Sequence, residues 1–205
     1  MEKVNYDKKT EEVINSLSGK PTLLLHSCCA PCSTACLERL FPYFNITVFY
    51  FNPNITESKE YYIRLDEQKR FLQEVYGDKV KLIEGRYLSR EFFDMAEGLE
   101  KEPEGGKRCY KCYEMRLNET AITAKRENFD YFCTTLSVSP HKNAEWINEI
   151  GNAIGEQYGV KFLPSDFKKQ NGYKKSIDLS KEYNLYRQNY CGCIYSKYAH
   201  ISEEN

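Results

Sequence analysis

The sequence predicts an α/β fold in which helices cover both faces of a parallel sheet. Short runs of β-branched and aromatic residues alternate with helical patterns along the chain, which is typical of consecutive βαβ units. The 205 residues leave room for one domain, and no repeat or Pro/Gly-rich linker divides them. We therefore predict a single domain over residues 1–205, with an N-terminal extension (1–20), an α/β core (21–165) and a basic, aromatic C-terminal segment (166–205).

The predicted elements follow in chain order. Five short apolar runs are expected to form buried strands: 21–26, 46–51, 80–83, 131–136 and 160–163. Helical patterns lie between or beside them: 32–40, 54–75, 89–98, 109–126 and 143–158. The second helix is predicted to be capped by Asn54 with Glu57 three residues later, because this spacing is a capping-box pattern. No element is predicted in 1–20 or 166–205.

The predicted sheet places three loops together. In parallel sheets, functional sites lie beyond the carboxyl ends of the strands. The loops that begin at His26, Thr134 and Ser165 each leave the end of a predicted strand. We therefore expect the residues of these loops to meet at one edge of the sheet, with a metal site there.

Composition excludes several classes of protein. Lys and Arg total 29, Asp and Glu total 30, and the net charge is −1, so the chain is no polycation. The longest apolar run, 46–51, is far below the ~20 residues of a membrane span. Residues 1–20 lack the apolar core of a secretory signal. We expect a cytoplasmic protein that makes no membrane contact.

The cysteines are the unusual feature of the composition. There are nine, which is many for a reducing compartment, where disulfide scaffolds are rare. Seven of them fall into three groups: Cys28, Cys29 and Cys32; Cys109 and Cys112; Cys191 and Cys193. Such clustering points to metal or redox chemistry. Cys36 and Cys133 are predicted to be small buried apolar residues.

Three kinds of site compete for these thiols. Zinc ribbons use cysteine pairs only about 15–20 residues apart, whereas here the tertiary fold would have to bring the groups together. A thioredoxin-like dithiol needs one C-x-x-C and leaves the other groups unexplained. An iron–sulfur cluster takes four thiolates, which can come from remote segments. The pattern favours metal binding, with iron–sulfur ahead of structural zinc, and leaves both open.

The C-terminal segment combines positive charge with aromatic rings. Eight Lys or Arg, three acidic residues and eight aromatic residues lie between Lys161 and His200. This composition suits RNA phosphates and an unstacked base, although a solvated helix face is an equally good interpretation. We predict that Arg187, Lys168 and Lys169 bind substrate. Asp166 follows a strand end, where a carboxylate can donate a proton, bind a metal or cap a helix.

Six segments carry a more specific signal: LLLHSCCAPCS (23–33), FYFNPNI (49–55), EPEGGKRCYKC (102–112), TTLSVSPHKN (134–143), SDFKK (165–169) and LYRQNYCGC (185–193). Together they resemble the QueH family of cobalamin-independent epoxyqueuosine reductases. The resemblance implies a Rossmann-like fold related to the nucleotide-binding α/β hydrolases. It also implies reduction of epoxyqueuosine in tRNA to queuosine, an external electron donor, a [4Fe–4S] cluster, a second single metal ion (iron or zinc) and no cobalamin.

The resemblance also implies roles for particular residues. It makes a metal-ligand pool of seven cysteines: Cys28, Cys29, Cys32, Cys109, Cys112, Cys191 and Cys193. The division between cluster and second metal stays open, with Cys109 and Cys112 favoured for the cluster. Asp166 is the candidate carboxylate ligand, and the C-terminal segment is expected to complete the metal site. Removing the epoxide oxygen as water consumes two electrons and two protons, so Asp166 or Tyr190 is the expected proton donor.

Two other functions are alternatives to this one. ATP-dependent iron–sulfur tRNA sulfurtransferases bind ATP with a Gly-rich SGGxDS loop after strand one, whereas this chain has no glycine between His26 and Pro31. A zinc-stabilised RNA-binding module is the non-enzyme alternative, and it would contain no iron.

Overall fold

One parallel sheet forms the centre of the protein. The computed structural model describes residues 4–203. Its five strands lie in the order β3-β2-β1-β4-β5, and every neighbouring pair is parallel. The strands are β1 (Thr22–His26), β2 (Asn45–Tyr50), β3 (Lys81–Glu84), β4 (Tyr131–Thr134) and β5 (Lys161–Phe162). The predicted α/β fold class is confirmed.

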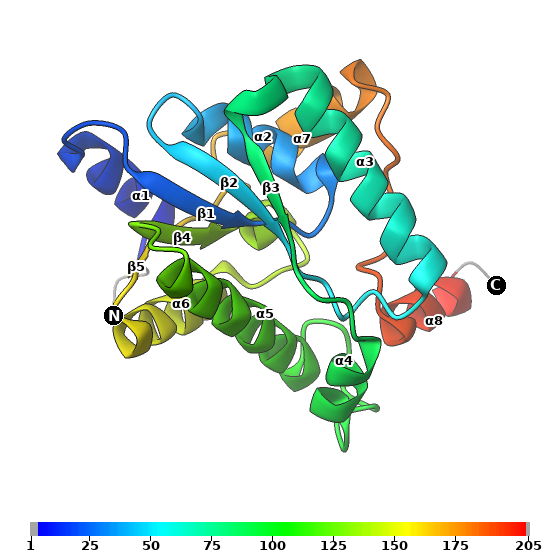
Figure 1. The fold of residues 1–205 in the computed structure, drawn as a ribbon. Coiled ribbons are helices and arrows are strands. Elements are labelled where there is room, and N and C mark those ends of the chain that lie inside the picture. Colours follow the sequence, from blue (N-terminus) through cyan, green and yellow to red (C-terminus); the bar gives the residue numbers. More distant parts are fainter. Residues whose placement is uncertain (1–3, 204–205) are drawn as a thin grey trace.

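Helices cover both faces of the sheet (Figure 1). One face carries α2 (Ala30–Leu40), α3 (Ser58–Tyr76) and α7 (Gly172–Glu182), and the other carries α5 (Lys107–Arg126) and α6 (Ala144–Tyr158). The remaining helices are α1 (Tyr6–Ser16), α4 (Ser89–Ala96) and α8 (Ile194–Glu203), with single 3-10 turns at Gly77–Lys79 and Thr135–Val138. No helix within residues 4–203 has the length and apolarity needed to cross a bilayer.

The sheet is buried on both sides, which explains its continuous apolar strands. Along β1, Leu23 and Leu25 pack into the core beneath α2 and α3, whereas Leu24 packs into the core beneath α5 and α6. All three leucines are fully buried. Cys36 and Cys133 are also fully buried in the first core, as predicted. Two cores hold the strands rigidly and fix the positions of the loops that follow them.

Two local predictions were wrong. Asn54 does not cap α3, because the helix starts at Ser58 and its N-cap residue is Glu57. Instead, the Asn54 amide donates to the carbonyl oxygen of Cys191 at 3.3 Å. The fourth strand was expected to reach residue 136 but ends at Thr134, whose hydroxyl accepts a hydrogen bond from the main-chain N–H of Leu136 at 3.2 Å and begins a 3-10 turn.

Three helices were not predicted from the sequence. α1 packs beside α2, where Asp7 forms an ion pair with Arg39 at 2.7 Å. α7 buries only Ser176 and Ser180 within its own length, so it has no apolar stripe for a pattern to detect. α8 follows directly after Cys193 and lies beyond the carboxyl ends of the strands (Figure 1). The described part of the C-terminal segment therefore contains two helices, α7 and α8.

Candidate metal centre

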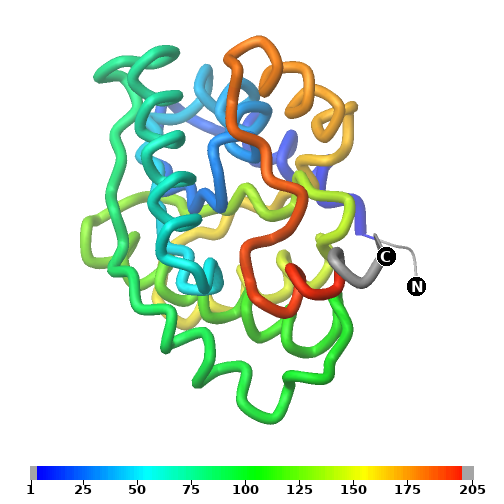
Figure 2. Tube along the Cα trace, turned by 90° about the vertical axis from the view of Figure 1, so that its right-hand side faces the viewer, coloured from blue at the N-terminus to red at the C-terminus, as the bar shows by residue number. Residues whose placement is uncertain are grey.

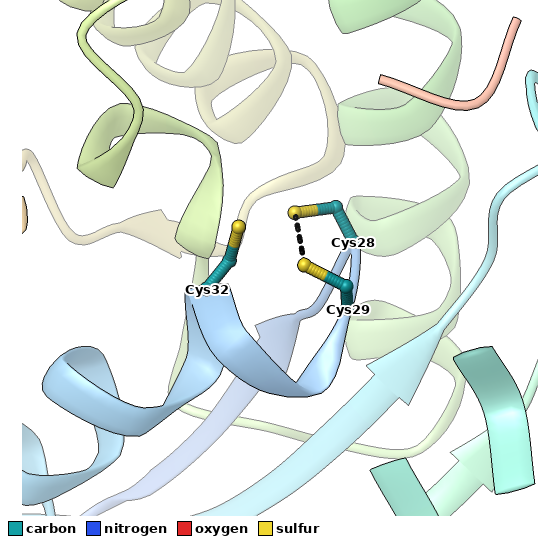
Figure 3. A group of neighbouring side chains, drawn as sticks. All are labelled: Cys28, Cys29 and Cys32. Carbon is teal, nitrogen blue, oxygen red and sulfur yellow. Dashed lines mark hydrogen bonds between the residues drawn. The ribbon is translucent and has the colours of Figure 1, made fainter. Parts of the chain in front are cut away.

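The cysteine triad, defined as Cys28, Cys29 and Cys32, lies where β1 passes into α2. Its three sulfur atoms are all within 4.8 Å of one another, and they face a common space (Figure 3). The Sγ atoms of Cys28 and Cys29 are 3.8 Å apart. Three convergent sulfurs are a ligand set for a soft or borderline metal ion.

Local geometry explains why the triad forms. Cys29 is the N-cap residue of α2 and has extended backbone angles, which turn the chain from the strand into the helix. Pro31 in the first turn is suited to a helix start, since its missing N–H is not needed there. The main-chain N–H of Cys28 donates to the Thr135 hydroxyl at 3.3 Å, which ties the loop to the end of β4. The triad is thus set by one strand-to-helix turn.

The four-cysteine group consists of Cys109, Cys112, Cys191 and Cys193, and it lines a single cavity. Cys109 and Cys112 come from the first two turns of α5. Cys191 and Cys193 precede α8, and their Sγ atoms are 3.5 Å apart. Two segments that are remote in sequence therefore supply one set of four thiols.

The segment that carries Cys191 runs across the molecule beside α3 (Figure 2). The Arg64 guanidinium donates to the carbonyl oxygen of Cys191 at 3.3 Å, the same atom that accepts from Asn54. The main-chain N–H of Thr56 donates to the carbonyl oxygen of Gly192 at 3.2 Å. Polar contacts from and near α3 thus hold the two C-terminal thiols in place.

Gly192 is required between the two C-terminal cysteines. Its φ of 109° lies in the region that favours glycine. A Cβ at this position would approach the Ile55 side chain to 2.8 Å and the Arg64 guanidinium to 3.2 Å. The Cys-Gly-Cys motif therefore reflects both backbone conformation and lack of space.

Each thiol group contains one acidic member. Hydrogen bonds from the Cys29 and Cys32 thiols hold the pKa of Cys28 well below its ordinary value. The hydrogen bond between the Cys191 and Cys193 sulfur atoms lowers the pKa of Cys191 to about 5. Because the thiolate is the form that binds a metal, the lowered pKa of Cys28 and of Cys191 favours the ligating form of one thiol in each group.

Helix N-termini surround these sulfurs. Cys29 caps α2, Cys109 lies in the first turn of α5, and Cys193 immediately precedes α8. Main-chain N–H groups donate directly to two of the sulfur atoms, from Gly105 to Cys109 at 3.2 Å and from Ser196 to Cys193 at 3.4 Å. Such N–H groups and the helix dipoles stabilise negative charge on thiolates.

The two thiol groups adjoin each other. The triad lines a second cavity, and four residues line both: Glu104, Arg116, Lys142 and Cys191. The three cysteine groups of the sequence therefore meet at the carboxyl edge of the sheet, and the C-terminal segment forms part of the site.

The other predicted site residues fall into two places. Tyr190 and Arg187 line the triad cavity. Asp166, Lys168 and Lys169 line a third cavity, which shares His141 and Lys142 with the triad cavity. Asp166 pairs with Lys168 at 2.6 Å and lines neither thiol cavity. Its role as ligand or acid remains a prediction.

Several site residues were missed by sequence reasoning. Lys142 lines all three cavities, and Glu104 lies between the thiol groups and accepts a hydrogen bond from Ser196 at 2.9 Å. The local signals for them are modest: Arg116 lies about one turn after Cys112 on α5, and Glu104 and Lys142 lie within the segments 102–112 and 134–143.

Unsatisfied polar atoms mark the same cavities. Within the described residues, three buried side-chain atoms lack a hydrogen-bond partner: Asn54 Oδ1, Arg64 NH2 and Gln188 Oε1. Asn54 lines the four-cysteine cavity, and the other two line the triad cavity. Buried polar groups are normally satisfied, so these atoms leave both cavities with hydrogen-bonding capacity for a polar ligand or water. Together with the donor sulfurs, they fit thiolate-bound metals.

Comparison with known proteins gives a consistent result. The family model described as "Epoxyqueuosine reductase QueH" matches residues 23–199. A Staphylococcus epidermidis protein named epoxyqueuosine reductase QueH is 45% identical over 203 residues, covering 95% of this chain and 85% of its own length. Its Streptococcus pyogenes serotype M1 counterpart is 43% identical over 201 residues, covering 95% and 79%. The Thermotoga maritima protein of the same name is 35% identical over 193 residues, covering 89% and 97%.

Proposed function

This chain belongs to the epoxyqueuosine reductase QueH family, and from that premise we propose that it reduces epoxyqueuosine in tRNA to queuosine. The family match carries the proposal, and the convergence of seven thiols supports it. The reaction removes the epoxide oxygen as water and leaves an alkene. It consumes two electrons from an external donor and two protons. The protein is thus an oxidoreductase that acts on a modified nucleoside.

We propose that the two thiol groups hold different metals. The four-cysteine group offers the four thiolates that a [4Fe–4S] cluster requires. The triad offers three, which leaves a tetrahedral ion one open position. When bound, the cluster supplies single electrons and the ion supplies a Lewis acid for the epoxide oxygen.

The chain's own residues then bind substrate and move protons. Tyr190 lines the triad cavity, where burial raises the pKa of its phenol, so the group stays protonated and available as an acid. The Arg64 guanidinium lies over the Tyr190 ring, 5.1 Å from its centre, and orients it. We assign proton donation to Tyr190 and keep Asp166 as the alternative donor or metal ligand from the adjoining cavity.

Replacing Tyr190 by Phe should lower kcat by about 100-fold and leave the metal content unchanged.

Substrate recognition is assigned to the polar lining of the triad cavity and its neighbour. The unpaired Gln188 Oε1 accepts and the unpaired Arg64 NH2 donates, which suits a ligand rich in hydroxyl and N–H groups. Arg187 lines the same cavity, and Lys168 and Lys169 line the adjoining one, where positive charge suits the phosphates of an RNA strand.

The decisive experiment is anaerobic reconstitution with iron and sulfide, followed by an assay on epoxyqueuosine-containing tRNA with a chemical reductant and no cobalamin. We expect iron–sulfur absorption and formation of queuosine. A fully loaded protein that leaves the nucleoside unchanged would overturn the proposal. A zinc-containing, iron-free protein that binds RNA would favour the non-enzyme alternative.

A further inference from the structure

Three arginines are almost completely buried around the thiol cavities, and their charges are balanced differently. Arg64 pairs with Glu60 at 2.7 Å. Arg108 donates to three main-chain carbonyl oxygens in the loop 99–102. Arg116 is only 3% exposed, and among the side chains that the structure describes (residues 4–199) no carboxylate forms an ion pair with it. Because an uncompensated buried charge is costly, Arg116 requires an anion from another source.

The hydrogen-bond partners of Arg116 do not supply that anion. Its NH2 group donates to Asn52 Oδ1 at 2.7 Å, and its Nε lies 3.4 Å from His26 Nε2. Asn52 is uncharged, and burial lowers the pKa of His26 to about 3, so the imidazole is neutral at physiological pH. These contacts fix the position of the guanidinium and leave its charge in place.

Glu104 lines the same two cavities but forms no ion pair with Arg116, so the thiols are the partners that the geometry favours for its charge. Cys109, Cys112 and Arg116 share one face of α5 at positions i, i+3 and i+7. Arg116 also lines both cavities and therefore faces the triad. Burial alone would lower the pKa of Arg116, but the charges of Cys112 and Cys28 raise it. Lys142 is a second cation beside both groups, but it is half-buried, so water screens it more strongly.

We propose that Arg116 is a positioning residue whose fixed charge raises the reduction potential of the centre held by the four-cysteine group. This rests on the proposed function, because it takes that centre to be redox-active. On reduction by a one-electron donor, the net charge of the centre becomes one unit more negative, and the protein gains no proton. A buried guanidinium stabilises that added charge. Arginine suits this role because it stays protonated at every relevant pH.

The test is a redox titration of the reconstituted protein, monitored by visible absorption and electron paramagnetic resonance. At the potential where half of the wild-type centre is reduced, Arg116→Gln should lower the ratio of reduced to oxidised centre about tenfold, or about 59 mV for one electron. Asn52→Asp is the second variant. It places a carboxylate where Oδ1 already accepts from Arg116, neutralises the guanidinium in place, and should shift the ratio in the same direction.

Arg126→Gln is the matched control. It removes the same charge from the same helix, but ten residues further along, about 15 Å away, where the side chain is 61% exposed. Its ratio should equal that of the wild type. An unchanged ratio in a loaded Arg116→Gln or Asn52→Asp protein would overturn the proposal, as would an equal shift in Arg126→Gln. If Arg116→Gln and Asn52→Asp fold but bind no iron while Arg126→Gln binds it, Arg116 has a structural role instead, and the proposal is overturned. A wild-type protein without a reducible centre would contradict the proposed function itself.

Discussion

The two thiol groups adjoin each other but are built in different ways. The triad comes from five consecutive residues at one strand-to-helix turn, supported by rigid β1 and α2. The four-cysteine group joins the first turns of α5 to a C-terminal segment that reaches the site only after crossing beside α3. Local geometry is sufficient for the first group, whereas long-range contacts are needed for the second.

This difference predicts separate vulnerabilities. The triad depends on the sheet and its two cores, so, apart from changes to its own cysteines, only changes that unfold the domain should disturb it. The four-cysteine group depends on a few polar contacts at Cys191 and Gly192, made by Asn54, Thr56 and Arg64. Substitutions at those contacts should release the C-terminal thiols while the triad stays intact.

The largest expected effects come from the ligands themselves. Cys112→Ser should abolish iron–sulfur absorption, and Cys29→Ser should retain it while losing about one metal ion per chain. Each should lower turnover at least about 100-fold, since even outer-shell changes at metal sites cost 10- to 100-fold. Serine at position 29 still suits the N-cap of α2, so the fold should survive. Metal analysis and visible spectra of the two proteins check this.

Cys36→Ser is the control for these ligand variants. Its thiol is fully buried in the apolar core, so the variant tests loss of a cysteine without loss of a ligand. Its spectrum and metal content should match the wild type even if its stability falls. Loss of iron–sulfur absorption in Cys29→Ser would contradict the proposed division between the two groups.

The contrast between the groups also explains what the sequence could predict. The strands and the α5 and α6 helices were predictable because their burial leaves a periodic apolar pattern. The triad was predictable because it lies at a strand end. The prediction that Asn54 caps α3 was wrong because a contact with Cys191, 137 residues away, outweighs a local capping pattern. Glu60, Glu67 and Arg70 on α3 resemble a solvated charged face, yet they contact the C-terminal segment.

The next effect concerns Gly192. Gly192→Ala adds a Cβ that would meet Ile55 at 2.8 Å and forces alanine into a positive φ, so the free energy of unfolding should fall by about 1–3 kcal/mol. The displaced segment should bind less iron in the four-cysteine group, and the triad should keep its ion. Gly19→Ala is the matched control, since its φ of 88° is also positive but no atom lies within 4 Å of the added Cβ. Equal iron contents in the two variants would contradict this account of the motif.

A smaller, pH-dependent effect is expected at Glu67. Its carboxylate accepts from Arg70 and from the main-chain N–H of Tyr186, and the Arg70 hydrogen bond holds the pKa of Glu67 below the ordinary 4.5. Because the folded pKa is the lower one, the stabilisation is complete above about pH 4.5 and is lost as the pH falls through the folded value. The free energy of unfolding of the wild type should therefore exceed that of Glu67→Gln by about 1 kcal/mol near neutral pH. This difference should vanish in acid.

Thermal midpoints measured across this pH range check the prediction. Glu12→Gln is the control, because a hydrogen bond from Lys9 also lowers the pKa of Glu12, but the pair is exposed on α1 and touches no part of the site. Its midpoint should follow the wild type closely. A Glu67→Gln difference that persists unchanged at low pH would show that the carboxylate charge is not what anchors the segment.

The smallest expected effect separates substrate binding from both thiol groups. Lys169 makes no ion pair with the side chains described for residues 4–199, whereas the charge of its neighbour Lys168 is already balanced by Asp166 at 2.6 Å. If Lys169 neutralises a phosphate, Lys169→Gln should reduce the slope of log affinity for tRNA against log salt by about 0.7–0.9. Lys168→Gln should change the slope less, and both variants should keep full metal content.

Filter-binding titrations over a range of salt concentrations measure the slopes. Equal slopes for wild type and Lys169→Gln would move the phosphate contact away from this cavity and leave Arg187, on the triad cavity, as the remaining predicted cation for it.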